Sequence, residues 1–181
     1  VAMGAIVVLG GAGGVGRVAV EALTHIDAVD EVVVTDLRAE AAKAVVAELG
    51  SPKLRAAAVD VGDPGALDAL IGDASVVLNC VGPFYRFGPP TLEAAIRCGV
   101  GYVDICDDLD ATQALLALDD RAKAAGVTAL IGMGNSPGLA NIFVRLCADG
   151  LLDEVRSADI CHIRGGEPSE VLVAGQAPAP P

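Results

Sequence analysis

Three glycines near the N-terminus have the spacing of a phosphate-binding turn. Gly11, Gly13 and Gly16 fit the pattern G-x-G-x-x-G, with Gly14 and Val15 between the last two. In such a turn the first glycine allows a tight bend, the second admits a pyrophosphate close to the backbone, and the third lets a helix pack against a strand. The free N–H groups and the positive dipole end of that helix then face the phosphates. The chemistry indicated is dinucleotide binding.

The motif alone is weak evidence, because a chain with 22 glycines can contain this spacing by chance. The residues around the turn supply the context that is needed. An apolar run at 6–9 predicts a buried strand before the turn, and the spacing over 15–23 predicts a helix after it. A second apolar run at 32–35 ends at Asp36, 20 residues after Gly16. At this spacing a carboxylate accepts hydrogen bonds from the adenosine ribose. We therefore expect a cofactor loop rather than a purely structural glycine turn.

The residues after this second strand bear on cofactor choice. A 2′-phosphate beside Asp36 would bring like charges to about 4 Å, which costs about 4 kcal/mol per unit charge at an effective dielectric constant of about 20. Arg38 can pair with such a phosphate, but we favour the alternative of a solvated residue at a helix start. Leu37 lies between them and is also an expected cofactor contact. The cofactor is expected to be NAD(P), with NAD(H) preferred over NADP(H) by about tenfold.

The elements needed to position these residues follow in regular alternation. Repeated βα units favour the α/β class and a Rossmann-type doubly wound parallel sheet, which binds ligands at the carboxyl ends of its strands. We place this NAD(P)-binding domain at residues 1–150. Further strands are predicted at 54–61, 75–80, 102–106 and 127–131, and helices at 39–49, 64–71, 89–97, 111–125 and 137–147.

The ends of the third and fourth predicted strands supply further cofactor candidates. Asp60 and Val61 are placed to approach the adenine ring, although Asp60 is equally well explained as the cap of a turn. Cys80, Val81 and Gly82 end the fourth strand, and Gly82 would permit backbone close to the nicotinamide ribose.

An aromatic cluster follows the fourth strand. All three phenylalanines and one of the two tyrosines lie within residues 81–90, in a chain with only 3% aromatic residues. Phe84 and Tyr85 are expected to wall a nicotinamide or substrate pocket, and the alternative is a hydrophobic plug under a loop. Farther along, one acid among Asp107, Asp108 and Asp110 is expected to cap a helix.

Composition excludes several partners. Twelve basic and 24 acidic residues give a net charge of −12, which argues against nucleic acid and anionic membrane surfaces. No apolar stretch is long enough for a membrane span and no signal-peptide pattern is found, so a cytoplasmic protein is expected. Two histidines are too few to suggest a zinc site, and no metal is expected. Five cysteines without C-x-x-C spacing are expected to be reduced, buried thiols: Cys80, Cys98, Cys106, Cys147 and Cys161.

Four motifs together resemble the nucleotide-binding half of the saccharopine dehydrogenase (saccharopine reductase) family, over about residues 5–150. They are Gly11-Ala12-Gly13-Gly14-Val15-Gly16, Val81-Gly82-Pro83-Phe84, Tyr102-Val103-Asp104 and Ser136-Pro137-Gly138-Leu139-Ala140-Asn141. The resemblance implies an NAD(P)-dependent oxidoreductase, whose best known relatives reduce an imine formed between an amino group and an aldehyde. It also implies a substrate site lined by Phe84, Asp107 and the loop from Asn135 through Pro137 to Gly138, to which we add Pro83 and Tyr85. No catalytic acid follows from it.

Two features depart from this family pattern. A substrate with several carboxylates should meet basic residues, but these loops offer Arg86 against three aspartates, so the substrate stays open. Residues 151–181 are expected to begin an incomplete substrate domain, with a strand at 155–163 and a proline-rich end at 177–181. The expectation is a truncated enzyme, inactive alone, with a possible homodimer through the missing domain. The alternatives are a non-catalytic, redox-sensing NAD(P)-binding module and a structural fragment.

Overall fold

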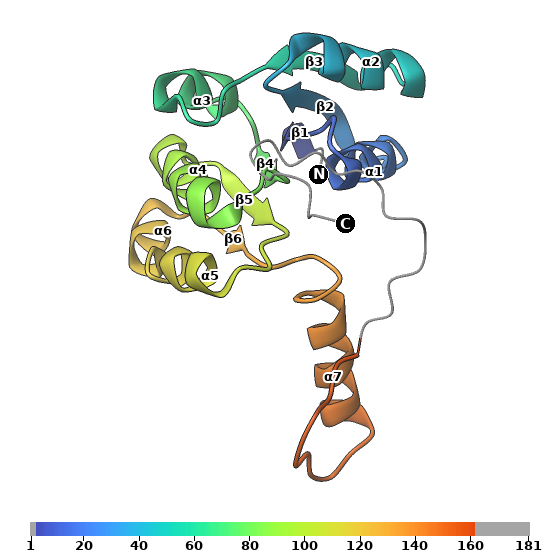
Figure 1. The fold of residues 1–181 in the computed structure, drawn as a ribbon, viewed down its shortest axis with the longest axis vertical. Coiled ribbons are helices and arrows are strands. Elements are labelled where there is room, and N and C mark those ends of the chain that lie inside the picture. Colours follow the sequence, from blue (N-terminus) through green and yellow to red (C-terminus); the bar gives the residue numbers. More distant parts are fainter. Residues whose placement is uncertain (1–2, 162–181) are drawn as a thin grey trace, which may run out of the picture.

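The computed structural model describes residues 3–161 of the 181-residue chain. Its strands form one parallel sheet in the order β3-β2-β1-β4-β5-β6 (Figure 1). This order reverses between β1 and β4, so the predicted Rossmann-type α/β fold is confirmed. The strands are β1 (Met3–Leu9), β2 (Val29–Asp36), β3 (Leu54–Ala58), β4 (Val76–Asn79), β5 (Gly101–Asp104) and β6 (Ala129–Leu130). The helices are α1 (Gly14–Thr24), α2 (Ala39–Leu49), α3 (Pro64–Ile71), α4 (Phe84–Cys98), α5 (Leu109–Leu116), α6 (Asp119–Ala125) and α7 (Leu139–Gly150).

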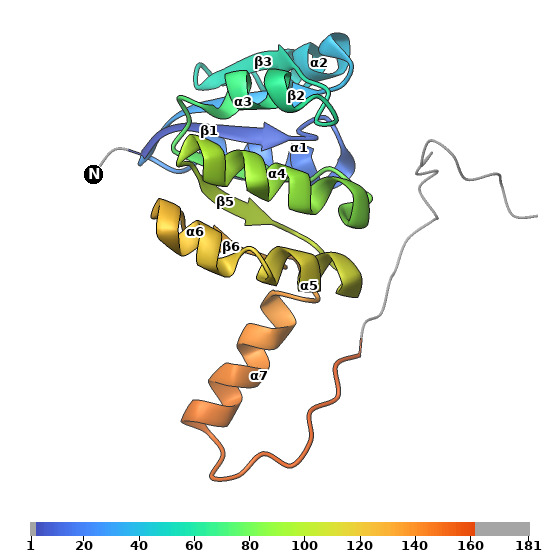
Figure 2. The same ribbon diagram turned by 90° about the vertical axis from the view of Figure 1, so that its left-hand side faces the viewer.

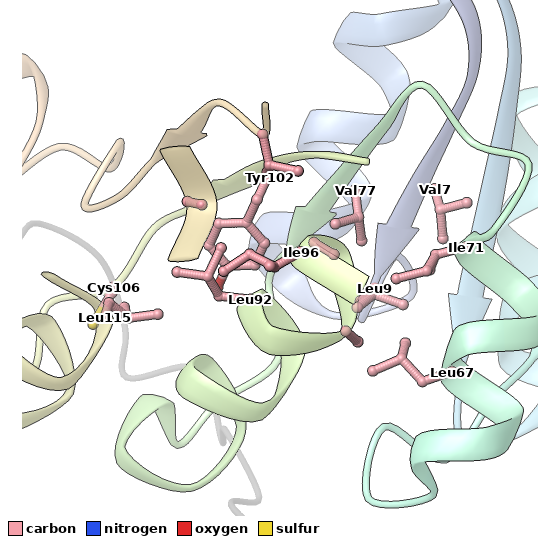
Figure 3. Close-up of a cluster of buried hydrophobic side chains, with 14 of the residues drawn as sticks. Val7, Leu9, Leu67, Ile71, Val77, Leu92, Ile96, Tyr102, Cys106 and Leu115 are labelled. Atoms are coloured by element: carbon pink, nitrogen blue, oxygen red, sulfur yellow. The ribbon is translucent and has the colours of Figure 1, made fainter. Parts of the chain in front are cut away.

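Helices cover both faces of the sheet. Successive side chains of a strand point to opposite faces, so the apolar residues of β1 need helices on both sides to be buried. On one face Ile6 and Val8 of β1 are buried with Val20 of α1 and neighbouring side chains of α2. On the other face Val7 and Leu9 lie in the larger cluster drawn in Figure 3. The helices α3, α4 and α5 contribute to that cluster Leu67, Ile71, Leu92, Ile96 and Leu115.

The helices α2 and α3 have their predicted bounds, because their ends are set by local sequence. The Oδ1 atom of Asp63 accepts a hydrogen bond from the Gly65 N–H at 2.9 Å, and Pro64 occupies the first helical position. Gly50 and Gly99 end α2 and α4 with φ angles of 59° and 71°, which favour glycine.

The predicted start of α4 at Pro89 and Pro90 is wrong, because the helix already begins at Phe84. Pro83 is the N-cap residue, and its carbonyl accepts a hydrogen bond from the Phe87 N–H at 3.1 Å. The Phe84 side chain is buried in the core. Burial of the Phe84 side chain thus outweighs the loss of the two backbone hydrogen bonds that the prolines cannot donate.

Residues 111–125 form two helices rather than the predicted single one. Between them, Leu118 packs against the core. Asp119 and Asp120 lie in the first turn of α6, where acidic side chains favour a new helix N-terminus. The strands β3 to β6 are shorter than predicted. Each of them lacks predicted residues at its carboxyl end, where the chain enters a loop, and β4 and β6 also begin later than predicted.

The last described helix, α7, projects from the sheet domain in both views (Figures 1 and 2), and none of its residues is buried. Residues 151–161 form no strand, so the strand predicted at 155–163 is wrong over its described part. A strand needs a neighbouring strand's hydrogen bonds, and none of the described strands pairs with this segment. The rest of that strand and the proline-rich end lie outside the described residues. In the described part of the chain, no helix is both long and apolar enough to cross a membrane.

The cysteines are all free thiols, but they differ in exposure. Cys106 is buried, and Cys80 and Cys98 are partly buried. The prediction of buried thiols is wrong for Cys147 and Cys161, which are exposed because α7 and the segment after it lie outside the core.

Candidate functional site

The glycine-rich turn connects β1 to α1, and three of its glycines are required by backbone angle or by space. Gly10 has a φ of 72°, a conformation that side chains rarely adopt. A Cβ atom on Gly11 would lie 2.9 Å from Val34 Cγ1, and one on Gly16 would overlap the backbone of Gly10. Gly16 therefore has the expected packing role. Gly11 allows the turn to pass close to Val34 of β2, and Gly10 supplies the positive φ of the bend.

The middle of the turn is open to solvent. Gly13 and Gly14 are exposed, and no atom lies within 4 Å of a Cβ placed on Gly14. Gly13 is the N-cap residue of α1, and its N–H donates to the Gly10 carbonyl at 2.9 Å. The first N–H groups of a helix have no partner within the helix, so α1 presents donors at Gly14 and at the exposed Val15. An anionic ligand can approach this backbone.

The turn lies at the point where the strand order reverses, between the ends of β2 and β4. The Gly11 N–H donates to the Thr35 carbonyl of β2 at 2.7 Å. On the other side, a Cβ on Gly10 would lie 3.1 Å from Val81 Cγ2 and 3.2 Å from the Cys80 carbonyl oxygen. The structure thus brings predicted contacts from separate strand ends into the crevice where doubly wound sheets bind ligands.

Two opposite charges lie beside the turn at the end of β2. The Asp36 side chain is 18% exposed, and its Oδ1 atom accepts a hydrogen bond from the Arg38 N–H at 3.0 Å. The Nε atom of Arg38 lies 3.7 Å from the same oxygen, and its side chain is 81% exposed. Leu37 between them is also exposed. The carboxylate suits ribose hydroxyls and the guanidinium suits a 2′-phosphate, so both cofactor types find a partner here.

Asp60 caps a turn, which is one of its two predicted roles. Its Oδ1 atom accepts a hydrogen bond from the Gly62 N–H at 2.8 Å. The segment stays beside β2, because the Val59 N–H donates to the Asp36 carbonyl at 3.1 Å. Val61 is half-buried against the core. The contact of Asp60 and Val61 with adenine stays a prediction.

The residues after β4 have contrasting environments. Phe84 is 8% exposed and packs in the core, as the alternative of a hydrophobic plug requires, whereas Tyr85 is 67% exposed. Pro83 is half-buried, and Gly82 is exposed with no atom within 4 Å of a Cβ placed on it. Gly82 and Tyr85 are therefore accessible to a ligand, while Phe84 supports the loop from the core side.

The loop between β6 and α7 folds back on itself. Gly138 has a φ of 119°, and a Cβ there would overlap the backbone of Gly134. The Asn135 carbonyl accepts a hydrogen bond from the Ala140 N–H at 3.0 Å. Asn135 is exposed and Pro137 half-buried. The bend thus explains why position 138 is glycine. The substrate contacts of this loop stay predictions.

The acidic segment after β5 divides as expected. The Oδ1 atom of Asp108 caps α5 by accepting a hydrogen bond from the Ala111 N–H at 2.8 Å, whereas Asp107 is exposed. The exposed Arg86 guanidinium stacks on the ring of Phe87, 4.9 Å from its centroid.

A buried polar network joins β5 to the loops after it and after β6. The Asp104 side chain is fully buried. Its Oδ2 atom accepts a hydrogen bond from the Tyr102 hydroxyl at 2.8 Å. Its Oδ1 atom accepts from the N–H groups of Cys106 at 3.0 Å and Gly132 at 2.7 Å. Three donors thus offset the cost of burying this carboxylate.

Asn79 extends the network to β4. Its Nδ2 donates to the Tyr102 hydroxyl oxygen at 3.3 Å, and its Oδ1 accepts from the Val81 N–H at 3.0 Å. Burial, together with the negative charge of Asp104, raises the pKa of Tyr102 well above its usual value. The same two causes raise the pKa of Cys80 to about 11. Near pH 7 Tyr102 therefore keeps the proton that it donates, and Cys80 is not a thiolate nucleophile.

Sequence reasoning assigned no function to Asn79, Tyr102 or Asp104, although a signal was present. Tyr102 and Asp104 are two residues apart on one strand, so their side chains share a face. Asn79 ends the apolar fourth strand. Polar side chains at the ends of buried strands indicate groups that must hydrogen-bond to each other.

Comparisons with known proteins agree with this geometry. Residues 6–130 match the family described as "Saccharopine dehydrogenase NADP binding domain". The chain is 25% identical over 180 residues to carboxyaminopropylagmatine dehydrogenase of Synechocystis sp., covering 95% of this chain and 45% of that protein. It is 30% identical over 129 residues to carboxynorspermidine synthase of Vibrio cholerae, covering 65% and 31%. Apo saccharopine dehydrogenase (L-Glu forming) from Saccharomyces cerevisiae superposes with a TM-score of 0.69 at 26% identity, covering 81% and 31%.

The chain spans less than half the length of these relatives. The matched residues 6–130 include the glycine-rich turn, Asp36, the loop after β4 and the three side chains of the buried network, Asn79, Tyr102 and Asp104. The chain therefore belongs to the saccharopine dehydrogenase family and contains its NADP-binding domain.

Proposed function

We propose that this chain is the cofactor-binding part of an NAD(P)-dependent oxidoreductase. The observation that carries the proposal is the open glycine turn at the start of α1, where exposed Gly13 and Gly14 lie beside Asp36 at the reversal of strand order. Backbone donors there suit a pyrophosphate, and a strand-end carboxylate suits the ribose.

The reaction that we propose is hydride transfer at a C–N bond, of an imine or a secondary amine, in an amino-acid-like substrate. Support comes from the relatives, whose names refer to saccharopine, carboxynorspermidine and carboxyaminopropylagmatine, all amine-containing compounds. The exposed Tyr85, Asp107 and Asn135 are the side chains proposed to face the substrate.

We further propose that residues from 151 onward begin a substrate domain. The apolar side chains of α7, including Phe143 at 55% and Leu146 at 64% exposed, would pack against that domain. Support comes from the relatives, of which this chain spans less than half. Turnover then requires residues outside this chain to orient the substrate, so the isolated chain is expected to be inactive.

The cofactor is proposed to be NAD(H) in preference to NADP(H). Asp36 holds its carboxylate at the end of β2, where a 2′-phosphate would meet a like charge. The family description names NADP, and Arg38 beside Asp36 favours a phosphate. The carboxylate is the less exposed of the two groups and is held by a backbone N–H, which favours its effect over that of the solvated arginine.

Calorimetric titration with NADH tests cofactor binding at the turn. Gly13→Val places a branched side chain where the pyrophosphate approaches the backbone. Its φ of −75° suits a side chain, and the new Cβ would lie 3.2 Å from the Gly10 carbonyl oxygen, a contact that a shift of a few tenths of an ångström relieves. We expect the variant to fold and to lose affinity for NADH by at least about 100-fold. The control is Gly150→Val on α7, an exposed glycine at which an added Cβ would meet no atom within 4 Å, and it should bind like the wild type. Wild-type affinity in Gly13→Val would contradict the assignment.

A further inference from the structure

Three loops at the carboxyl edge carry the residues expected near the nicotinamide and the substrate. They follow β4, β5 and β6, and each directs one backbone N–H into the buried network. The Val81 N–H donates to Asn79 Oδ1 at 3.0 Å. The N–H groups of Cys106 and Gly132 donate to Asp104 Oδ1 at 3.0 Å and 2.7 Å. The three loops are therefore tied to one set of side chains.

Asp104 lies at the centre of this set. It contacts two of the loops directly, and its backbone carbonyl also accepts a hydrogen bond from the Met133 N–H at 2.8 Å. It reaches the third loop through the Tyr102 hydroxyl and then the Asn79 side chain. The Tyr102 hydroxyl donates to Asp104 and accepts from Asn79. A change in the hydrogen bonding of Asp104 therefore also alters the hydrogen bonding of Asn79.

Stability alone does not account for a fully buried carboxylate at this position. A buried charge costs free energy unless it is fully paired, and well-packed apolar side chains often replace such a group without loss. What apolar side chains cannot do is accept N–H groups from two loops and fix their spacing. The carboxylate is therefore better explained by the placement of the loops than by the strength of the core.

We propose that Asp104 is a positioning residue for the nicotinamide half of the cofactor. It fixes the relative placement of the three loops, with Tyr102 and Asn79 carrying its effect to Val81 and Gly82. This inference rests on the proposed binding of NAD(P) at this edge. The adenosine half meets other elements, namely the glycine turn and Asp36 at the end of β2. The turn is joined to β2 by the hydrogen bond from the Gly11 N–H to the Thr35 carbonyl at 2.7 Å.

Amide hydrogen exchange followed by NMR tests the coupling of the loops without any cofactor. In Asp104→Asn an amide NH₂ replaces one acceptor oxygen, so the Tyr102 hydroxyl and the two N–H groups of Cys106 and Gly132 cannot all be satisfied. We expect the Val81 and Gly132 amides to exchange about tenfold faster or more, while Gly11 is unchanged. Unchanged exchange at Val81 overturns the inference. Equal acceleration at Gly11 does so too, because it would show a general loss of stability.

Binding of NADH and of ADP then tests the role itself, since ADP lacks both the nicotinamide and its ribose. We expect Asp104→Asn to weaken NADH about tenfold or more and ADP less than about twofold. The control Asp68→Asn, which removes the exposed ion pair with Arg97, should change neither. Equal weakening of both ligands, or of neither, overturns the inference.

Two further outcomes are distinguishable. If the wild-type chain binds neither ligand, the proposed function and the nicotinamide role both fail, while hydrogen exchange still decides whether Asp104 couples the loops. If Asp104→Asn does not fold, Tyr102→Phe replaces it, because this variant keeps the Asp104 bonds to Cys106 and Gly132 but removes the link to Asn79. Val81 should then exchange faster and Gly132 should not. Binding of NADH should again weaken more than binding of ADP, and failure of either result overturns the inference.

Discussion

The two halves of the carboxyl edge are built in opposite ways. Beside β1 the site depends on missing side chains, because Gly10, Gly11 and Gly16 let three backbone segments approach each other. Beside β4 and β5 it depends on buried polar side chains, Tyr102 and Asp104 among them, that hold the loops by hydrogen bonds. The first half should therefore be broken by adding atoms, and the second by removing or titrating a hydrogen-bonding partner.

The largest effect is expected from an added methyl group in the glycine half. In Gly16→Ala the new Cβ would overlap the Gly10 backbone, which cannot move without separating α1 from β1. We expect the free energy of unfolding to fall by about 3 kcal/mol or more, measured by urea denaturation. Gly14→Ala is the matched control, because its Cβ meets no atom within 4 Å, and it should be neutral or slightly stabilising. Equal losses in both variants would show that crowding is not the cause.

Alkaline pH should act on the polar half. The folded-state pKa of Cys80 is about 11 against an ordinary 9.0, and that of Tyr102 lies above its ordinary 10.0. Both groups thus stay protonated in the folded chain while the unfolded chain ionises, so stability is present below about pH 9 and is lost as pH rises. Between its unfolded-state pKa and its folded-state pKa, each group lowers the free energy of unfolding by up to about 1.4 kcal/mol per pH unit.

Urea denaturation between about pH 8 and pH 11 measures this loss, and Tyr102→Phe isolates the tyrosine. The variant should start less stable at pH 8, because Asp104 and Asn79 each lose a partner, but should lose less stability above pH 10 than the wild type. If the free energy of unfolding falls with pH equally in Tyr102→Phe and in the wild type, the burial of the Tyr102 hydroxyl is contradicted. Tyr85→Phe, at an exposed tyrosine, should follow the wild type.

Cofactor preference is a smaller effect within the glycine half. We expect the wild type to bind NADH about tenfold tighter than NADPH, or about 1.4 kcal/mol. Asp36→Ala should erase or invert this ratio, and Arg38→Ala should weaken NADPH more than NADH, because the arginine suits only the 2′-phosphate. Competitive titration of both cofactors gives the ratios. Tighter binding of NADPH by the wild type would mean that Arg38 outweighs Asp36.

The smallest effect is expected on α7, which belongs to neither half. Leu146→Ala should change the free energy of unfolding of this chain by less than about 0.5 kcal/mol, because the side chain is already 64% exposed. Leu115→Ala in the core should cost about 2 to 5 kcal/mol. Thermal and urea denaturation of both variants make the comparison, and a large loss in Leu146→Ala would show that α7 packs in solution.

The features that sequence predicted well are those determined by neighbouring residues. The glycine spacing and the bounds of α2 and α3 each depend on a few consecutive positions, such as the Asp63-Pro64 cap and Gly50. The doubly wound parallel sheet followed from repeated βα units, since right-handed crossovers leave few alternatives.

The features that it missed depend on contacts between distant segments. The hydrogen bond from Asn79 to Tyr102 requires the register in which Asn79 lies opposite Asp104, and no local pattern specifies that register. The early start of α4 depends on burial of Phe84 against the core. The strand expected at 155–163 is absent over its described part, because none of the described strands pairs with that segment.

Mapping NADH binding by ¹⁵N NMR tests the central claim most directly, because it reports which backbone amides the cofactor reaches. We expect the largest shift changes at the amides of residues 11–16, at Leu37 and at Gly82, with little change on α7. A competing location exists in the hollow on α7 lined by Ile142, Arg145, Leu146, Asp149 and Gly150. Shift changes confined to that hollow, or absent from the glycine turn at saturating NADH, would contradict dinucleotide binding at the turn.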